Sequence, residues 1–162
     1  MNDAHFHLVV NHLPIVGVLI GFLVLLVGLI TKASQVKITA LGIFLFSGIA
    51  AIGAYYTGEG AEDIVENMSG ISETLIHDHE EFAERFLTFI LILGSTAVMT
   101  FFLELKKLKF AKYGFLLVLI LSIISIGLAK YVGTSGGEIR HTEIRTENAL
   151  IQIDSAKDHD DD

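Results

Sequence analysis

The sequence predicts an all-α membrane protein in which four transmembrane helices form one bundle, with both termini on the same side. Three observations lead to this fold class. Hydrophobic residues make up 52% of the 162 residues, and the mean hydropathy is +0.61. The apolar residues gather in four nearly uncharged blocks of about 17 to 20 residues, the length that crosses about 30 Å of hydrocarbon as a helix. The polar segments between the blocks are alternately short and long.

The four apolar blocks cover residues 13–30, 38–56, 86–103 and 113–129. Unbroken apolar runs of this kind differ from the alternating pattern of barrel strands, so each block is expected to be a helix. We expect membrane spans over residues 8–30, 38–56, 86–105 and 112–132, inside one membrane domain that covers residues 1–141. The remaining residues, 142–162, make an acidic tail that we expect to be flexible.

The distribution of charge predicts the orientation. An even number of spans puts residues 1–12, the long connection 57–85 and the tail on one side. The short loops on the other side are dense in lysine, which marks the cytoplasmic side. Both termini are therefore expected outside, in a bacterial inner membrane. All but one of the 19 acidic residues lie on this outer side, and Glu104 is the exception. The lysines of the short-loop side are Lys32, Lys37, Lys106, Lys107, Lys109 and Lys112.

Composition excludes several classes of protein. The chain has no cysteine, which rules out disulfides, thiolate metal sites and covalent haem attachment. Its formal charge of -8 argues against a nucleic-acid partner. Residues 1–13 contain no Lys or Arg, so they lack the positive start of a signal peptide, and we expect the first apolar block to be kept as a helix.

The long connection is expected to be structured. Ser72 is a suitable N-cap for a helix that begins at Glu73, and no proline interrupts the chain before Lys106, so this helix should be about 50 Å long. Residues 57–67 read as a separate short helix near the membrane surface, with Gly58, Gly60 and Gly70 as turns. That helix and the first turns of the next one would form an outer cap.

Three polar segments should meet at the outer edge of the membrane. In the first, a helix from about Ala4 would place His5 and His12 seven residues apart on one face, with a bend at Pro14. In the second, one helical stripe is expected to face the bundle interior, and His79 lies off that stripe. In the third, Glu138 and His141 have the Glu-x-x-His spacing of carboxylate-bridged metal bundles, and Glu59 and Glu62 repeat its three-residue step. The stripe consists of His77, Glu81, Glu84, Thr88, Leu91 and Ser95.

Ionisable groups at a bundle edge are costly unless they are paired or coordinated, so metal or haem-iron ligation is the preferred interpretation. A structural network of His–Glu and Arg–Glu pairs, or solvated residues with no common role, are the alternatives. Individually, His7, His79 and His159 are read as having no special role. The expected ligands are His12, His77 and His141, joined by the carboxylates of Glu81, Glu84 and Glu138. Secondary candidates are His5, His7, Glu59, Glu62 and Glu80.

This nitrogen and oxygen ligand set suits iron, zinc or manganese. None of the spans has a histidine near its middle, so haem b would lie at the outer edge, between His12 and either His77 or His141.

Three short motifs stand out in the sequence: His7-x-x-x-x-His12-x-Pro14, Gly58-x-x-Ala61 and Gly136-Gly137-Glu138. Together they resemble a bacterial four-helix membrane family catalogued as domain of unknown function 2231, over about residues 5–141. The resemblance implies respiratory or redox company, because members are often found with cytochrome c-type modules. It implies no settled activity. The chain departs from the family in having Thr134-Ser135 where a histidine is expected, which shifts attention to His141.

The leading functional hypothesis is therefore an integral membrane metal- or haem-binding protein that serves electron transfer or metal handling at its outer face. One alternative is a non-catalytic accessory subunit of a larger respiratory or export complex, docked through its acidic surface. Another is a metal-dependent membrane enzyme, with Glu80 or Glu81 beside His77 as general base. The sequence leaves open a homo-oligomer.

Overall fold

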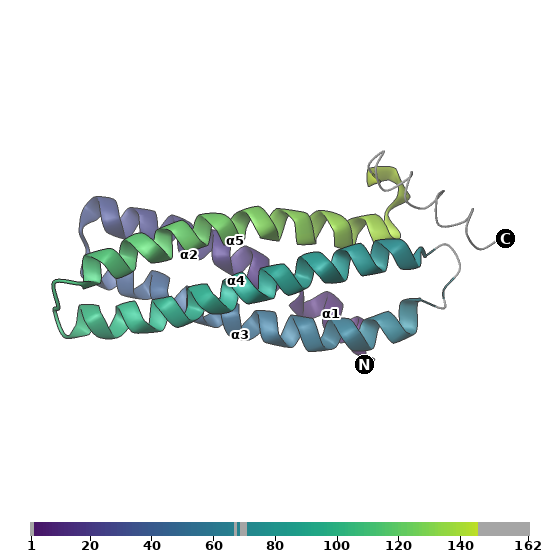
Figure 1. Ribbon diagram of the computed structural model, residues 1–162, viewed down its shortest axis with the longest axis horizontal. Coiled ribbons are helices and arrows are strands. Elements are labelled where there is room, and N and C mark those ends of the chain that lie inside the picture. Colours follow the sequence, from purple (N-terminus) through teal and green to yellow (C-terminus); the bar gives the residue numbers. More distant parts are fainter. Residues whose placement is uncertain (1, 67, 69–70, 146–162) are drawn as a thin grey trace.

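The computed structural model describes residues 2–66, 68 and 71–145, and every regular element among them is a helix. Four long helices lie side by side along the longest axis of the molecule, and a short one, α1, packs against α3 (Figure 1). The elements are α1 (Asp3–Val10), α2 (His12–Thr31), α3 (Ser34–Val65), α4 (Glu73–Leu105), α5 (Ala111–Arg140) and the 3-10 helix η1 (Thr142–Ile144).

The two ends of the bundle differ in charge. The end of α3, the start of α4 and the end of α5 lie together at one end, which we call the acidic end (residues 2–12, 57–66, 71–85 and 133–145) (Figure 1). The α2–α3 and α4–α5 turns lie at the other, which we call the basic end (residues 31–37 and 104–112). The predicted meeting of the three polar segments at one end is confirmed. The side of a membrane that each end faces stays a prediction.

Among the described residues, four helices are long and apolar enough to cross a membrane, and the predicted all-α four-helix arrangement is confirmed. Their outward faces are also apolar. Leu23 on α2 is 53% exposed and Ile123 on α5 is 55% exposed, and similar side chains continue along every long helix. A protein surrounded by water rarely exposes so much contiguous apolar surface, so the outer surface suits lipid.

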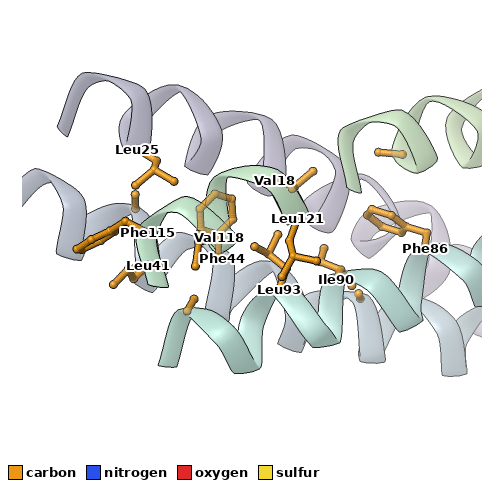
Figure 2. Packing of buried hydrophobic residues seen from close by; sticks show 14 of the residues in the cluster. Val18, Leu25, Leu41, Phe44, Phe86, Ile90, Leu93, Phe115, Val118 and Leu121 are labelled. Atoms are coloured by element: carbon orange, nitrogen blue, oxygen red, sulfur yellow. The ribbon is translucent and has the colours of Figure 1, made fainter. Parts of the chain in front are cut away.

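The buried core runs along the bundle axis and takes residues from all four long helices (Figure 2). Because lipid is as apolar as these side chains, the association of the helices rests on close packing rather than on transfer out of water. The ten labelled members are Val18, Leu25, Leu41, Phe44, Phe86, Ile90, Leu93, Phe115, Val118 and Leu121.

Small residues allow the helices to approach closely. A Cβ added at Gly21 would lie 2.8 Å from Cε1 of Phe44, and one at Gly114 would lie 2.5 Å from Oγ1 of Thr100. A Cβ at Gly17 would collide with the hydroxyl of Ser47. These glycines therefore set the spacing between α2 and α3 and between α4 and α5.

Several buried hydroxyl groups are satisfied within their own helices, whereas the buried Oγ of Ser125 has no hydrogen-bond partner among the described residues. Ser47 donates to the carbonyl oxygen of Ile43 at 2.8 Å, and Thr100 donates to that of Thr96 at 2.8 Å. Ser122 bonds back in the same way, to Leu119 at 2.7 Å. Such bonds remove the cost of placing a hydroxyl in an apolar interior, but they do not tie one helix to another.

The predicted outer cap is wrong in one respect, because residues 57–65 are not a separate helix. They continue α3, which runs unbroken for 32 residues. Gly58 and Gly60 lie inside this helix rather than in turns, and the prediction for Gly70 lies outside the described residues. The helix from Glu73 is confirmed at 33 residues, although Ser72 makes no side-chain cap hydrogen bond.

The predicted bend near Pro14 is confirmed, and it separates α1 from α2. Helix α1 ends at Val10, whose carbonyl group is the one that Pro14, lacking an N–H, cannot bond. His5 and His12 therefore belong to different helices, and the prediction that they share one face of one helix is wrong. The break allows α1 to leave the axis of α2 and to pack against α3.

The stripe on α4 that was expected to face the interior faces outward. His77, Thr88 and Ser95 are all exposed, as are the other members of the stripe. The interior face of α4 instead carries Phe86 and Leu93, with Ile90 and Ala97 beside them. The same face also buries Gly94, Thr96 and Thr100, so small residues do line the interior, but at other positions than the expected stripe.

Candidate functional site

Two histidines from different helices turn into the acidic end. His7 comes from α1 and His79 from α4, and both side chains are partly buried. We call them the histidine pair. They are 72 positions apart in the sequence, and each lies against a neighbouring helix that supplies a glycine and a hydrogen-bond partner.

The position of His7 follows from the packing of α1 on α3. A Cβ added at Gly60 would lie 2.8 Å from the Asp3 side chain, and one at Gly58 would lie 3.3 Å from Cε1 of His7. The two glycines thus make room on α3 for the side chains of α1. This close approach explains why glycine occurs within a continuous helix, where its conformational freedom has a cost.

Hydrogen bonding fixes the tautomer of His7. Its Nδ1 lies 3.0 Å from the carbonyl oxygen of Ala54 and 3.3 Å from Oγ1 of Thr57. A carbonyl oxygen can only accept, so Nδ1 carries the proton and donates it. In the neutral ring the lone pair is then on Nε2, the atom that can bind a ligand.

His79 is held in the same way by α5. Its Nδ1 lies 3.0 Å from Oγ of Ser135, whose hydroxyl donates to the carbonyl oxygen of Val132 at 3.3 Å. The single hydroxyl proton is used in that bond, so Ser135 accepts from Nδ1 of His79 and Nε2 again keeps the lone pair. A Cβ added at Gly136 would lie 2.9 Å from Cε1 of this ring.

Burial keeps both rings neutral. The pKa of His79, which lies before the apolar segment of α4, is lowered to about 4 by desolvation, and a charge on His7 lowers it further. The pKa of His7 is also lowered, mainly by desolvation, while its bond to Ala54 opposes this and a charge on His12 adds to it. The three histidines are therefore electrostatic neighbours, and the pair is uncharged at neutral pH.

The three histidines predicted as ligands are all exposed and have separate surroundings. His12 bonds to the side chain of Asn11. His77 has a side chain that is 79% exposed and lies 3.9 Å from Glu80. His141 lies 2.9 Å from Glu143, and the backbone N–H of Glu143, together with this bond, lowers the pKa of the Glu143 carboxyl group.

The predicted carboxylate ligands also point to different neighbours. Glu81 forms an ion pair with Arg85, one turn away on α4. Glu84 accepts a hydrogen bond from Tyr55 at 3.4 Å. Glu138 is only 8% exposed and lies in the last turn of α5.

Glu138 and His141 were expected to project together from one helical turn, and this prediction is wrong. Helix α5 ends at Arg140, and His141 has left the helical conformation. Arg145 closes the end of the helix by donating to the carbonyl oxygens of Glu138 at 2.9 Å and Ile139 at 3.3 Å. Such bonds from a cation to the last carbonyls are a common way to cap a helix.

The secondary candidates line the acidic surface of the same end. His5 and Glu59 are exposed, whereas Glu62 and Glu80 are partly buried on α3 and α4. Burial and the neighbouring Glu80 carboxylate raise the pKa of Glu62. Among residues 2–66, 68 and 71–145, no three His, Asp or Glu side chains gather closely enough to hold a metal ion. The ligand set derived from the sequence therefore stays a prediction, and His159 lies outside the described residues.

Reading the sequence one residue at a time missed His79, although a signal for it exists. The buried residues Phe86, Leu93 and Thr100 recur every seven positions along α4, and the same step backwards from Phe86 reaches His79. A residue at that step shares the inward face of the helix. The spacing of His7 and Pro14 indicated that this segment was of interest, but the sequence gave no indication that His7 would bond to Ala54 on α3.

Comparison of the chain with protein-family models, with curated proteins and with solved structures finds no match. The resemblance to a family of unknown function accordingly stays a prediction that rests on its short motifs.

Proposed function

We propose that this chain is a membrane-anchored haem-binding protein, in which His7 and His79 supply imidazole ligands to the iron and the bound haem serves electron transfer. The observation that carries this proposal is the matched hydrogen bonding of the two rings. Each Nδ1–H is donated to a neighbouring helix, which leaves each Nε2 lone pair available. Histidines that bind metals almost always use their second ring nitrogen in this way, because the bond fixes the orientation of the ring and strengthens it as a ligand.

Protonation supports the same assignment. An imidazole binds iron only in its neutral form, and desolvation holds the pKa of His79 at about 4, so this ring is neutral throughout the physiological range. An exposed histidine such as His77 lacks both the burial and the anchored Nδ1.

The number of ligands favours haem over a bare metal ion. A porphyrin supplies four nitrogen atoms, so one or two imidazoles complete the coordination of its iron. Tetrahedral zinc needs three or four protein ligands. The histidine pair matches the first requirement, and His12, whose charge acts on His7, is a candidate for an additional ligand.

Small residues beside the rings allow them to pack closely against two neighbouring helices. Gly58 and Gly136 lie against the two imidazoles, where a Cβ would approach the ring carbons to 3.3 Å and 2.9 Å. The missing side chains let each ring pack directly against the backbone of a neighbouring helix. This packing helps to hold the two imidazoles in the fixed orientation that an iron ligand needs.

The proposed setting is the extracytoplasmic edge of a bacterial inner membrane. The lysine-rich turns at the basic end favour the cytoplasmic side, and the histidine pair would then lie outside. The acidic side chains around the pair would attract a basic redox partner such as a cytochrome c-type protein, mainly by raising its association rate.

The test is the absorption spectrum of the purified chain. The protein is expressed in bacterial membranes with added haem precursor, purified in a mild detergent, and examined in its oxidised and reduced forms. We expect a Soret band, about one haem per chain, and the low-spin spectrum of iron with two imidazole ligands. Iron, zinc and manganese are measured by elemental analysis in the same sample.

Matched variants locate the ligands. His7→Ala and His79→Ala should lower haem content by about tenfold or more or convert the remaining haem to a high-spin form. His5→Ala and His77→Ala, two positions away on the same helices, should change neither. Circular dichroism confirms that each variant is folded. A wild-type protein that stays colourless when haem is supplied, or equal low-spin haem in all four variants, contradicts the proposal.

One observation favours the accessory-subunit alternative. Carboxylates are exposed along α3 and α4 at the acidic end, including Glu59, Asp63 and Glu84, where they would suit a docking surface. A colourless, metal-free and fully folded protein that co-purifies with a larger respiratory complex would favour this function over haem binding.

A further inference from the structure

The basic end contains a cleft that the proposed function does not use. It has a volume of about 450 Å³ and lies where the start of α3, the end of α4 and the start of α5 meet. Four lysines and a single carboxylate contribute to its walls, so the cleft carries a positive charge. The charged residues and the aromatic ring of the lining are Lys37, Glu104, Lys107, Lys109, Lys112 and Phe115.

A fixed ion pair forms one side of the cleft. Nζ of Lys37 lies 2.9 Å from Oε1 of Glu104, and the two side chains are only 17% and 16% exposed. Ser34 donates a second hydrogen bond to the same carboxylate at 2.7 Å. The Lys37 ammonium group also lies 4.4 Å from the centre of the Phe115 ring. Glu104 is thus compensated by Lys37, and the charge of the other three lysines is in excess.

The turn after α4 places one of these lysines at an unusual position. Leu108 N–H donates to the Leu103 carbonyl at 3.0 Å and Lys107 N–H to the Glu104 carbonyl at 2.9 Å. These are the two bonds of a Schellman motif, in which glycine normally occupies the left-handed position. Here Lys107 occupies it with a φ of 53°.

Apolar side chains next to the cleft set its depth relative to lipid. Leu108, Phe110 and Tyr113 are between 44% and 59% exposed. They follow directly on the apolar segment of α4, so in a bilayer they would lie at the interface between hydrocarbon and head groups. A ligand of this cleft would therefore need a negatively charged group that contacts the lysines and an apolar part that contacts Leu108, Phe110 and Tyr113.

We propose that this cleft binds the phosphate head group of an anionic phospholipid. Lysine ammonium groups pair readily with phosphate oxygens, and basic pockets between membrane helices are typical sites for acidic head groups. The site lies at the opposite end of the bundle from the histidine pair, and it does not depend on haem binding. An inorganic phosphate ion shares the same chemistry, and the test separates the two ligands.

The experiment measures lipid binding to the full chain in detergent by native mass spectrometry. Phosphatidylglycerol and cardiolipin are titrated against phosphatidylcholine, and inorganic phosphate is titrated separately. Wild-type protein should bind the anionic lipids preferentially. The Lys109→Gln/Lys112→Gln double variant should bind them about 30-fold more weakly, from the attraction expected of two lysines near a membrane surface.

Two further variants make the result specific. Lys32→Gln/Lys106→Gln removes the same charge from the same end, outside the cleft lining, and should change affinity less than twofold. Lys107→Gly relieves the left-handed backbone strain, so it should raise the unfolding temperature while weakening lipid binding about fivefold. A purely structural lysine would show the first effect without the second.

Three results would overturn the proposal. One is an equal loss of lipid binding in the two double variants, which would mean that anionic lipids are attracted by the positive charge of the whole basic end and not by the cleft. Another is equal affinity for phosphatidylcholine and phosphatidylglycerol. The third is binding of inorganic phosphate as tight as that of lipid, which would assign the cleft to a soluble anion.

Discussion

Acid should destabilise this protein through His79. Its pKa is about 4 in the folded chain against 6.5 for a free histidine, because burial penalises the charged ring. Between these values the unfolded chain binds a proton that the folded chain does not. The free energy of unfolding therefore falls as the pH is lowered from 6.5 to 4, and the loss levels off below pH 4.

The size of the effect follows from the shift. One pKa unit corresponds to about 1.4 kcal/mol, so a shift from 6.5 to about 4 amounts to about 3 kcal/mol of lost stability. That is a substantial part of the stability of a small protein. The pKa of His7 is also lowered in the folded chain, so His7 adds to the loss of stability in the wild-type protein.

The assay is thermal unfolding in detergent between pH 7 and pH 4. Circular dichroism is the suitable probe, because the chain contains neither tryptophan nor cysteine. His79→Asn should flatten the pH dependence, and His77→Asn, two positions away on the exposed face of α4, should leave it unchanged. A wild-type curve and a His79→Asn curve of the same steepness would refute the reasoning.

Two further predictions concern packing and capping. Gly114→Ala should lower the free energy of unfolding by about 1–3 kcal/mol, because its Cβ would approach Oγ1 of Thr100 to 2.5 Å. Gly127→Ala is the control, because a Cβ there meets open space. It should leave the free energy of unfolding unchanged or raise it by up to about 1 kcal/mol. Thermal unfolding of both variants checks this, and equal losses would contradict it. Arg145→Ala should remove two hydrogen bonds to the last turn of α5 and speed amide exchange there but not at the start of the helix; unchanged exchange would show that the arginine does not cap it.

Hydrophobic blocks were sufficient to predict the four helices and their order, because only a helix of that length satisfies its backbone in lipid. Local rules failed where two segments touch. Gly58 and Gly60 looked like turn residues, yet they lie inside α3 because α1 packs against them. A glycine that permits a turn and a glycine that permits close contact are the same residue, and the sequence does not distinguish them.

The candidate site was predictable only in part. The sequence indicates that histidines gather at one end of the bundle, but not which of them turn inward. The ring of His79 is buried because α4 presents one face to α5, and its partner Ser135 is 56 positions away. The register between two helices depends on packing along their whole length, so a reading of each segment alone favoured the exposed His77.

The hydrogen bonding of hydroxyl groups to carbonyl oxygens of their own helices has a consequence for which substitutions this protein can accept during evolution. Since the hydroxyl groups of Ser47 and Thr100 donate within their own helices, they form no polar link between helices, and the fit of side chains sets the helix positions at these two contacts. Gly17 and Ser47 are then complementary in size across the contact of α2 with α3, and Gly114 and Thr100 are so across the contact of α4 with α5. A larger residue at either glycine would be tolerated only if its counterpart shrank in the same lineage, so these positions should vary in step when related chains are compared.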